Sequence, residues 1–274
     1  MREARRSQHA DMGYTGPGRS TVLLTAAAWS LCWMTAALAE KVPSYTEPAK
    51  PQVACEDDRP ANQAIRGCTD LEGAPDPDPA IRVRSYTMRG FAWLKDEEPL
   101  AANSDFDRSI AIDPTNPSAY KGRAWAYERL HQFGDAIKDW TRIIALKPGD
   151  PELYRERAYT HLLDRNYKLA VADFSQVLKL DENNLDSRIG RAISHDSMNQ
   201  LSEALADFEA AIKQNPKYTA VYIARGEMWE RRGKKEKAVA DFENALKLGA
   251  TSRRVQFALK RLGVSNVQRR RLSE

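Results

Sequence analysis

The chain has 274 residues, of which 42 are Lys or Arg, 38 are Asp or Glu, and 42% are hydrophobic. This composition is typical of a folded globular protein and excludes both a disordered chain and a polytopic membrane protein. The basic excess lies at the two ends, since residues 1–39 hold four Arg against two acids and residues 251–274 hold seven bases against one acid. Residues 40–250 are therefore net acidic, which argues against nucleic acid as a partner.

Residues 1–39 have the layout of an export signal. Four arginines precede an uncharged apolar run at 21–36, and Ala37-Leu38-Ala39 then supplies small residues at the two positions that a signal peptidase reads. We expect cleavage before Glu40 and a periplasmic or secreted mature protein, whether translation starts at Met1 or at Met12. The alternative is an uncleaved membrane anchor, because the uncharged stretch is long enough to span a bilayer at about 1.5 Å rise per residue.

Two proline-rich segments follow the leader. Residues 40–60 contain four Pro, scattered charges and no apolar period, which predicts a linker. Residues 61–82 combine a short apolar pattern at Asn62 to Leu71 with a second proline cluster at 75–79. We interpret them as a half-repeat that caps the next segment, followed by a loop.

Residues 83–252 repeat with a period of 34 and with no insertion or deletion. Within each half of a unit the apolar positions fall at helical intervals of three, four and seven, which predicts two amphipathic helices. Position 8 is Gly or Ala and position 20 is always Ala, so the two helices can approach closely, and a large ring at position 24 fills the remaining space. The units are 83–116, 117–150, 151–184, 185–218 and 219–252, and their position-24 rings are Phe106, Trp140, Phe174, Phe208 and Phe242.

This pattern resembles the tetratricopeptide repeat, a helix-turn-helix unit with aromatic, small and Pro residues in this order and spacing. The resemblance implies an all-α, right-handed superhelical solenoid of five units with one continuous core. Arg188 at an aromatic position, Glu182 and Ala250 at the Pro position, and a turn Gly present only as Gly233 depart from the pattern.

The ends of the repeat segment carry predicted helical caps. Residues 253–274 comprise a last helix, which we expect from Ser252 to Leu262 with Gly263 as its stop, and a basic tail. At the front, the half-repeat carries Cys68. Half-repeats bracketed by cysteines occur in exported bacterial proteins of the family that the chain resembles.

Cys55 and Cys68 are the only cysteines left once the leader is removed. An exported protein meets an oxidising compartment, so we expect them to form a disulfide that pins the linker to the first cap. A redox-active pair is the less favoured alternative, because catalytic thiols usually stand in a C-x-x-C spacing.

An Arg at position 7 and an Asp at position 23 occur in all five units. Five copies at one period cannot form one active site, and the two positions lie on facing sides of the two helices, where an Arg fork can meet a carboxylate. We interpret them as a structural ladder whose rungs, if partly exposed, contribute about 0.2–1 kcal/mol each. The pairs are Arg89 with Asp105, Arg123 with Asp139, Arg157 with Asp173, Arg191 with Asp207, and Arg225 with Asp241.

The sequence offers little for catalysis. His161 and His195 occupy the aromatic position 11, so we interpret them as packing residues; a zinc pair is the alternative, but zinc needs at least three protein ligands. A G-x-S-x-G motif and a Gly-rich phosphate loop are both missing. We therefore expect no enzyme, no catalytic residue, no metal and no cofactor.

By resemblance to the family, positions 2, 5, 9 and 12 of each first helix build the concave inner wall. We expect an apolar stripe there that faces water and binds a partner, with basic residues beside it; the alternative is that neighbouring helices bury the stripe themselves. The opposite end of the wall carries Asp186, Asp196, Glu227 and Glu230, which favours a partner segment basic at that end. The predicted groove residues are Phe91, Leu94, Lys121, Trp125, Arg155, Tyr159 and Ile193.

These features together predict an exported, non-enzymatic scaffold that binds a peptide segment of an envelope protein in its concave groove. A membrane-anchored accessory factor for envelope assembly or secretion is the alternative, with membrane contact only if the leader is retained. An enzyme with an unrecognised site is a further alternative.

Overall fold

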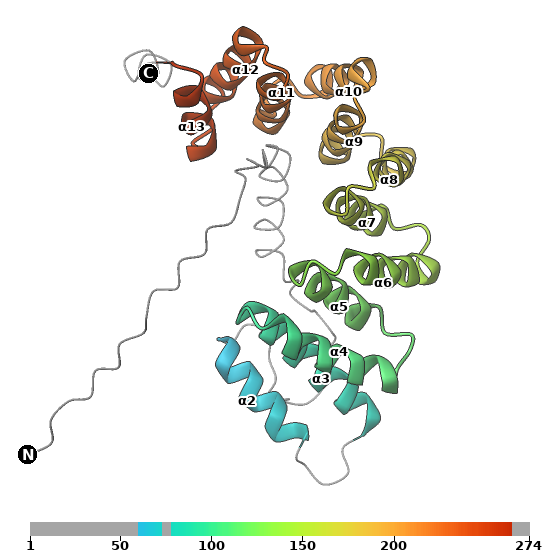
Figure 1. Cartoon of the computed structure of the whole chain (residues 1–274). Helices are drawn as coiled ribbons and strands as arrows, with labels where there is room; N and C mark the ends of the chain where they lie inside the picture. The colour runs from blue at the N-terminus through green and yellow to red at the C-terminus, as the bar shows by residue number, and fades with distance from the viewer. Residues whose placement is uncertain (1–59, 73–77, 265–274) are drawn as a thin grey trace, which may run out of the picture.

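The computed structural model describes residues 60–72 and 78–264 of the chain. These residues form twelve helices and no strand, and the helices stack in chain order along one curved array (Figure 1). The predicted leader, nearly all of the linker and the end of the basic tail lie outside the described residues.

Ten of these helices form five helix-turn-helix pairs. Helix α2 (Ala61–Glu72) precedes the pairs and packs on α3, and α13 (Arg253–Arg261) follows them and packs on α12. The pairs are α3 (Pro79–Lys95) with α4 (Pro99–Ile112), α5 (Pro117–Arg129) with α6 (Phe133–Leu146), α7 (Pro151–Leu163) with α8 (Tyr167–Leu180), α9 (Leu185–Ser197) with α10 (Leu201–Gln214), and α11 (Thr219–Arg231) with α12 (Lys235–Lys247).

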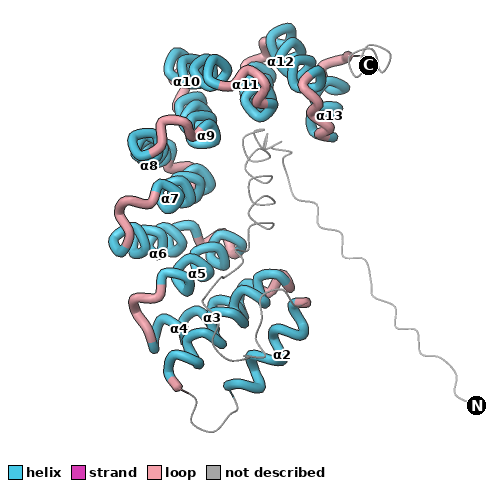
Figure 2. Tube along the Cα trace, turned by 180° about the vertical axis from the view of Figure 1, so that it is seen from behind, coloured by secondary structure: helices cyan, strands magenta, loops and turns pink. Residues whose placement is uncertain are grey.

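The array has a concave and a convex side. The first helices of the pairs, from α5 to α11, line the concave side, and their partners lie outside them (Figures 1 and 2). The predicted all-α, right-handed superhelical solenoid is confirmed.

Local sequence explains where several first helices begin. In α3, α5 and α7 a Pro stands at the first helical position, where its missing N–H has no intrahelical acceptor to lose. The residue before it caps the helix: Asp78, Asn116 and Asp150 each accept a bond from a backbone N–H of the first turn. Because Asp78 and Pro79 start α3, this helix begins four residues before the unit boundary predicted at Val83, in a stretch that we had assigned to a loop.

The turn inside each unit uses a left-handed residue at position 15. Glu97, His131, Arg165 and Asn199 have φ between 58° and 61°, and Gly233 has φ 68°. The missing turn Gly of the first four units therefore leaves the turn geometry unchanged. A non-Gly residue in this conformation costs about 1–2 kcal/mol, which the surrounding packing must offset.

Small residues let the helices of a unit and of neighbouring units approach closely. The five position-20 alanines and the five position-24 rings are all fully buried. A Cβ added to Gly90 would lie 2.6 Å from the Phe106 ring, and one added to Gly122 of the next unit would lie 2.2 Å from the same ring. Phe106 thus packs between two glycines, one on each side.

The buried apolar side chains form three groups, and the expected continuous core is interrupted between the first group and the second. The first group runs from Phe91 to Leu153, the second contains Ala158, Leu162, Ala170 and Phe174 in α7 and α8, and the third runs from Ile189 to Leu259. Ile193 packs against both the second and the third group. The first and second groups are separated along α7, where polar side chains enter the packing.

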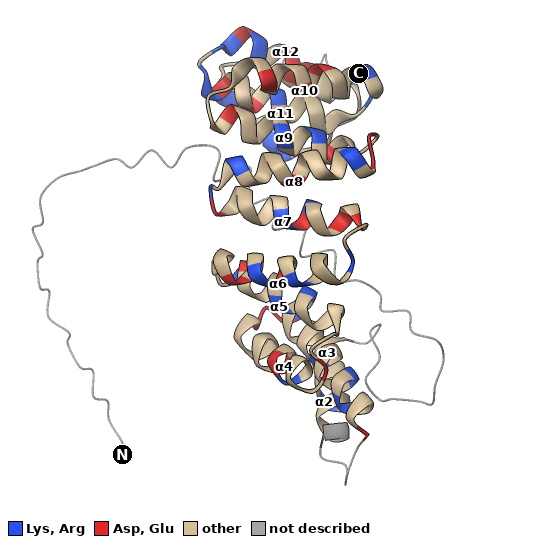
Figure 3. Ribbon diagram, turned by 90° about the vertical axis from the view of Figure 1, so that its right-hand side faces the viewer, with Lys and Arg blue, Asp and Glu red and all other residues tan. Residues whose placement is uncertain are grey.

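The helices carry charged residues of both signs. In the view of Figure 3, acidic and basic residues are interspersed along the ribbon of the array. Each helix in residues 60–72 and 78–264 is too short or too polar to cross a bilayer.

Candidate partner-binding surface

The aromatic stripe predicted for the inner wall is largely buried at its N-terminal end. Phe91 and Trp125 are 5% and 6% exposed, and Leu94 is 1% exposed. The Phe91 ring meets Phe106 edge-on at 5.2 Å and Trp125 at 6.2 Å, measured between centroids. The expectation that these side chains face water was wrong, because neighbouring first helices are close enough for their large rings to interlock.

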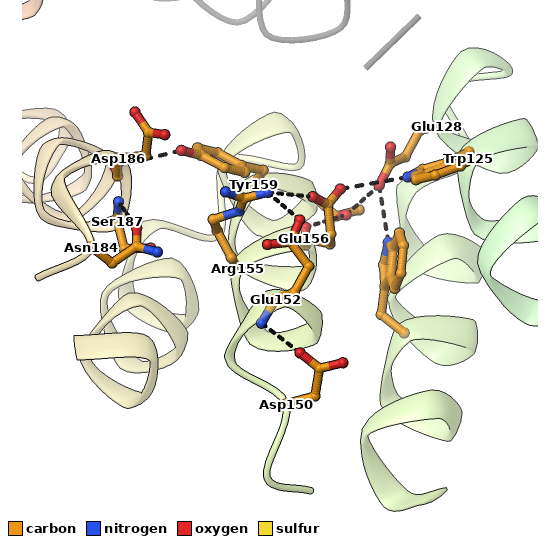
Figure 4. Close-up of polar contacts among 12 residues, drawn as sticks. Trp125, Glu128, Asp150, Glu152, Arg155, Glu156, Tyr159, Asn184, Asp186 and Ser187 are labelled. Carbon is orange, nitrogen blue, oxygen red and sulfur yellow. Dashed lines mark hydrogen bonds and ion pairs between the residues drawn. The ribbon is translucent and has the colours of Figure 1, made fainter. Parts of the chain in front are cut away.

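Tyr159 and Ile193 keep part of their surface open in the middle of the wall. Both are half-buried, and Tyr159 packs edge-on against Phe174 at 5.1 Å. The Tyr159 hydroxyl points towards α9, where it lies 3.5 Å from the backbone oxygen of Asp186 (Figure 4). Burial and nearby Asp186 raise the pKa of this phenol, so it stays neutral at physiological pH.

The two basic groove residues differ in what they contact. Arg155 is half-buried and forms ion pairs with Glu152 and Glu156 of its own helix. Lys121 lies over the face of Trp125, 4.8 Å from the ring centroid, and forms no ion pair with any described residue. Of the two, Lys121 is therefore the one whose charge a partner carboxylate can meet without displacing an existing pair.

A buried polar cluster lies behind this part of the wall, where α7 packs on α5 and α6. Glu128 is 5% exposed and accepts hydrogen bonds from the Trp140 indole at 3.0 Å and from the Thr160 hydroxyl. Glu156 is 3% exposed and accepts from the Trp125 indole at 3.5 Å and from Arg155 at 3.3 Å. Figure 4 shows these carboxylates facing each other between Trp125 and Tyr159.

The environment of Glu128 shifts its carboxyl towards the neutral form. Burial raises the pKa of Glu128 to about 7; Glu156 adds to the rise, and the hydrogen bonds from Thr160 and Trp140 oppose it. Sequence reasoning placed Glu128 on the inner wall but missed the cluster. The available signal was Trp140, which stands at a position where the other four units carry Phe.

Three of the four acids at the C-terminal end of the wall are already paired with arginines, which leaves less negative charge for a basic partner segment than the sequence suggested. Asp196 contacts Arg231 at 2.6 Å and Arg232 at 2.7 Å. Glu227 pairs with Arg254, and Glu230 with Arg261, both from α13. Asp186 remains exposed and accepts from the Tyr218 hydroxyl.

The structure brings together every predicted Arg and Asp rung, each through two parallel hydrogen bonds. In all five units Nε and Nη2 of the Arg lie 2.6–2.9 Å from the two carboxylate oxygens. The five Asp residues are buried. Burial lowers the pKa of Arg123, but Asp139 and Asp107 outweigh it and raise the pKa overall. The rungs thus hold the two helices of each unit together.

The two histidines do not lie in a common polar site. His161 is 5% exposed, its Nε2 lies 3.8 Å from Asp173, and burial lowers its pKa. His195 lies beside Gln200, with 2.7 Å between Nδ1 and Oε1. Within the described helices and loops, no three His, Cys, Asp or Glu side chains converge as a metal site would require.

Cys68 is buried in α2, where it is 1% exposed. Its predicted disulfide partner, Cys55, lies outside the described residues. The disulfide remains a prediction.

Comparisons with known proteins agree with this architecture. Models of the tetratricopeptide repeat match residues 106–138 and 189–253. A tetratricopeptide repeat protein from Parabacteroides merdae is similar over 90% of each chain, with a TM-score of 0.67 and 17% identity. No curated protein matches the chain.

Two further solved structures are similar over a part of this chain. MamA from Desulfovibrio magneticus matches 63% of this chain and 97% of its own, with a TM-score of 0.55 and 16% identity. YrrB, described as a TPR protein with an unusual peptide-binding site, matches 74% of this chain and 98% of its own, with a TM-score of 0.51 and 17% identity. The repeat pattern, the helix pairs and these matches show that the chain contains tetratricopeptide repeats and has the fold that they form.

Proposed function

We propose that the chain is a non-enzymatic interaction module that binds a segment of a protein partner along the middle of its concave wall. The observation that carries the proposal is a set of partly open apolar side chains on three successive first helices: Tyr159 on α7, Ile193 on α9 and Ile223 on α11. Apolar surface on a concave wall, next to charged groups, is typical of peptide recognition by a solenoid.

The charges that remain available indicate the chemistry of the partner. Lys121 lies on the N-terminal side of the apolar set, and exposed Asp186 lies within it. A segment with large apolar side chains and an acidic residue near Lys121 would fit this surface, because opposite charge beside an apolar contact fixes register. The peptide-binding site named for YrrB supports the same kind of ligand.

A non-enzymatic role is supported by the repetition itself. The Arg and Asp residues that recur in every unit pair with each other as rungs of the ladder, so their role is structural. Nothing in their arrangement requires a substrate.

The finer proposal is that the protein acts in the cell envelope after export, and that its partner is an envelope protein. The leader at 1–39 and the Cys pair support this location. Intact-mass analysis of exported material should find a chain that begins at Glu40. A full-length chain in the membrane fraction would instead favour the membrane-anchored accessory factor.

Photo-crosslinking tests the proposed surface. A crosslinking residue in place of Ile193 should capture the partner, and one in place of Leu169, which is 51% exposed on α8 of the outer layer, should not. Affinity for the captured segment should then fall roughly tenfold or more in the double variant Tyr159→Ala with Ile193→Ala. Equal capture from both positions, or unchanged affinity in a variant with native helicity, would place the binding surface elsewhere.

A further inference from the structure

Three polar side chains from three different helices meet at one point in the structure. Position 12 holds a fully buried Leu in the first and third units, Leu94 and Leu162, but Glu128 in the second. Position 24 is Phe in four units and Trp140 in the second. Position 10 is Ala in the first two units and Thr160 in the third.

The three side chains are complementary in their hydrogen bonding. The buried Glu128 carboxylate receives its two hydrogen bonds from the two other side chains, the Trp140 indole on α6 and the Thr160 hydroxyl on α7. A buried polar group is tolerated when such partners are present, and here they are supplied from two neighbouring units. The cluster is therefore a built joint between the second and third units, at the place where the first apolar group gives way to the second.

Glu128 has no cationic partner among the described residues, unlike the acids at the same repeat position in the fourth and fifth units. Asp196 and Glu230 stand at position 12 of the fourth and fifth units, and each pairs with at least one Arg. Glu128 forms no ion pair with any residue in the described part of the chain. The elements packed against it present the neutral Trp140 from α6 and, from α7, Thr160 together with the Glu156 carboxylate, whose own cation is Arg155.

We propose that Glu128 makes the contact between the second and third units proton-sensitive: α7 packs firmly on α5 and α6 when the Glu128 carboxyl is protonated, and this packing loosens when the carboxyl ionises. The joint lies between Trp125 and Tyr159, so it controls the inner wall next to the proposed binding surface (Figure 4). It is a property of the free chain and holds whether or not a partner binds there.

The direction of the effect follows from proton linkage. The pKa of Glu128 is about 7 in the folded chain and lies above 4.5, the ordinary value of a Glu carboxyl, so between these pH values the folded chain holds a proton that the open or unfolded chain releases. The stabilisation is complete below about pH 4.5 and is lost as the pH rises through about 7. Between these limits the equilibrium constant for opening rises by up to about tenfold per pH unit.

Hydrogen exchange at pH 5.5 and pH 8 tests the joint, with each rate divided by the intrinsic rate at the same pH. In the wild type, amides of α7 should lose about tenfold or more of their protection at pH 8 relative to amides of α10. Glu128→Gln, which keeps the shape without the charge, should remove this dependence. The matched control Glu230→Gln, at the same repeat position, should retain it.

Two results would overturn the proposal: equal relative protection of α7 at both pH values in the wild type, or a wild-type pH dependence in Glu128→Gln. Should Glu128→Gln fold poorly, Glu128→Leu restores the residue type of the first and third units and should likewise be insensitive to pH. Carbon-13 NMR of the Glu carboxyls gives a direct reading. One carboxyl should titrate near pH 7, and titration of all of them near 4.5 would also refute the joint.

Discussion

Neighbouring first helices are joined differently in the two halves of the solenoid. In the N-terminal half, Phe91 meets Trp125 at 6.2 Å and Trp125 meets Trp140 at 6.4 Å, so rings exclude water from the wall. In the C-terminal half, ion pairs such as Asp196 with Arg231 connect successive helices. The same backbone repeat thus accommodates either ring contacts or ion pairs between neighbouring helices. Partly open apolar surface remains in the middle of the wall, between the part with ring contacts and the part with ion pairs.

The largest expected effect comes from removing a ring of the N-terminal wall. Trp125→Ala leaves a cavity between Phe91 and Trp140 and should lower the free energy of unfolding by about 3–5 kcal/mol, measured by urea denaturation. The control is Phe257→Ala on the C-terminal cap, where the ring is 60% exposed and the change should stay within about 0.5 kcal/mol. Similar losses for both variants would remove the distinction between the two halves.

The first rung of the ladder should contribute more to stability than the fourth. In the first rung the Arg89 side chain is 7% exposed, whereas Arg191 in the fourth is 24% exposed. Asp105→Asn should therefore cost about 2–3 kcal/mol, since it leaves a buried cation short of an acceptor, and Asp207→Asn should cost about 1 kcal/mol. Thermal denaturation of the two variants at equal salt measures the difference, and the reverse order would contradict it.

The turns offer a smaller test. Gly233→Ala meets no atom within 4 Å, so only its left-handed backbone opposes the change, which should cost about 1 kcal/mol. The converse variant, Arg165→Gly, should gain a few tenths of a kcal/mol, because relief of the strain exceeds the added freedom of the unfolded chain only slightly. Calorimetry measures the stability of both variants. A Gly233→Ala variant as stable as the wild type would contradict the argument from backbone strain.

The smallest effect is expected for an exposed ion pair. Arg261 is 63% exposed in its pair with Glu230, so Glu230→Gln should change stability by only about 0.2–1 kcal/mol at low salt. That difference should shrink further in 0.5 M salt, because exposed charges are screened. If Glu230→Gln lost as much stability at high salt as at low salt, the ion pair between Glu230 and Arg261 would be shielded from solvent, as the ring contacts of the N-terminal half are.

Much of the architecture was predictable because the repeat supplies the same evidence five times. Small residues at positions 8 and 20, the ring at position 24 and the Arg and Asp positions each point to one geometry, and the helices follow it. The start of α3 was missed because Asp78 and Pro79 resemble a loop until the cap forms. The left-handed turns at residues such as Arg165 were hidden because packing, rather than a Gly, imposes them.

The inner wall was predicted less well than the helices. Position alone indicated that Phe91, Trp125 and Tyr159 share a face, but it did not determine which of them neighbouring helices would cover. Likewise, the acids near the C-terminal end looked available, although Arg231 and Arg254 reach them from the next helix.

The sequence by itself determined the period, the two helices of each unit and the rungs between them, because these depend on contacts within one unit and on local propensity. Only the tertiary structure decided which wall residues are buried, which charges are already paired and how Glu128 finds its partners. Those outcomes depend on distances between units, where a shift of a few tenths of an ångström decides whether a ring is covered or an ion pair closes.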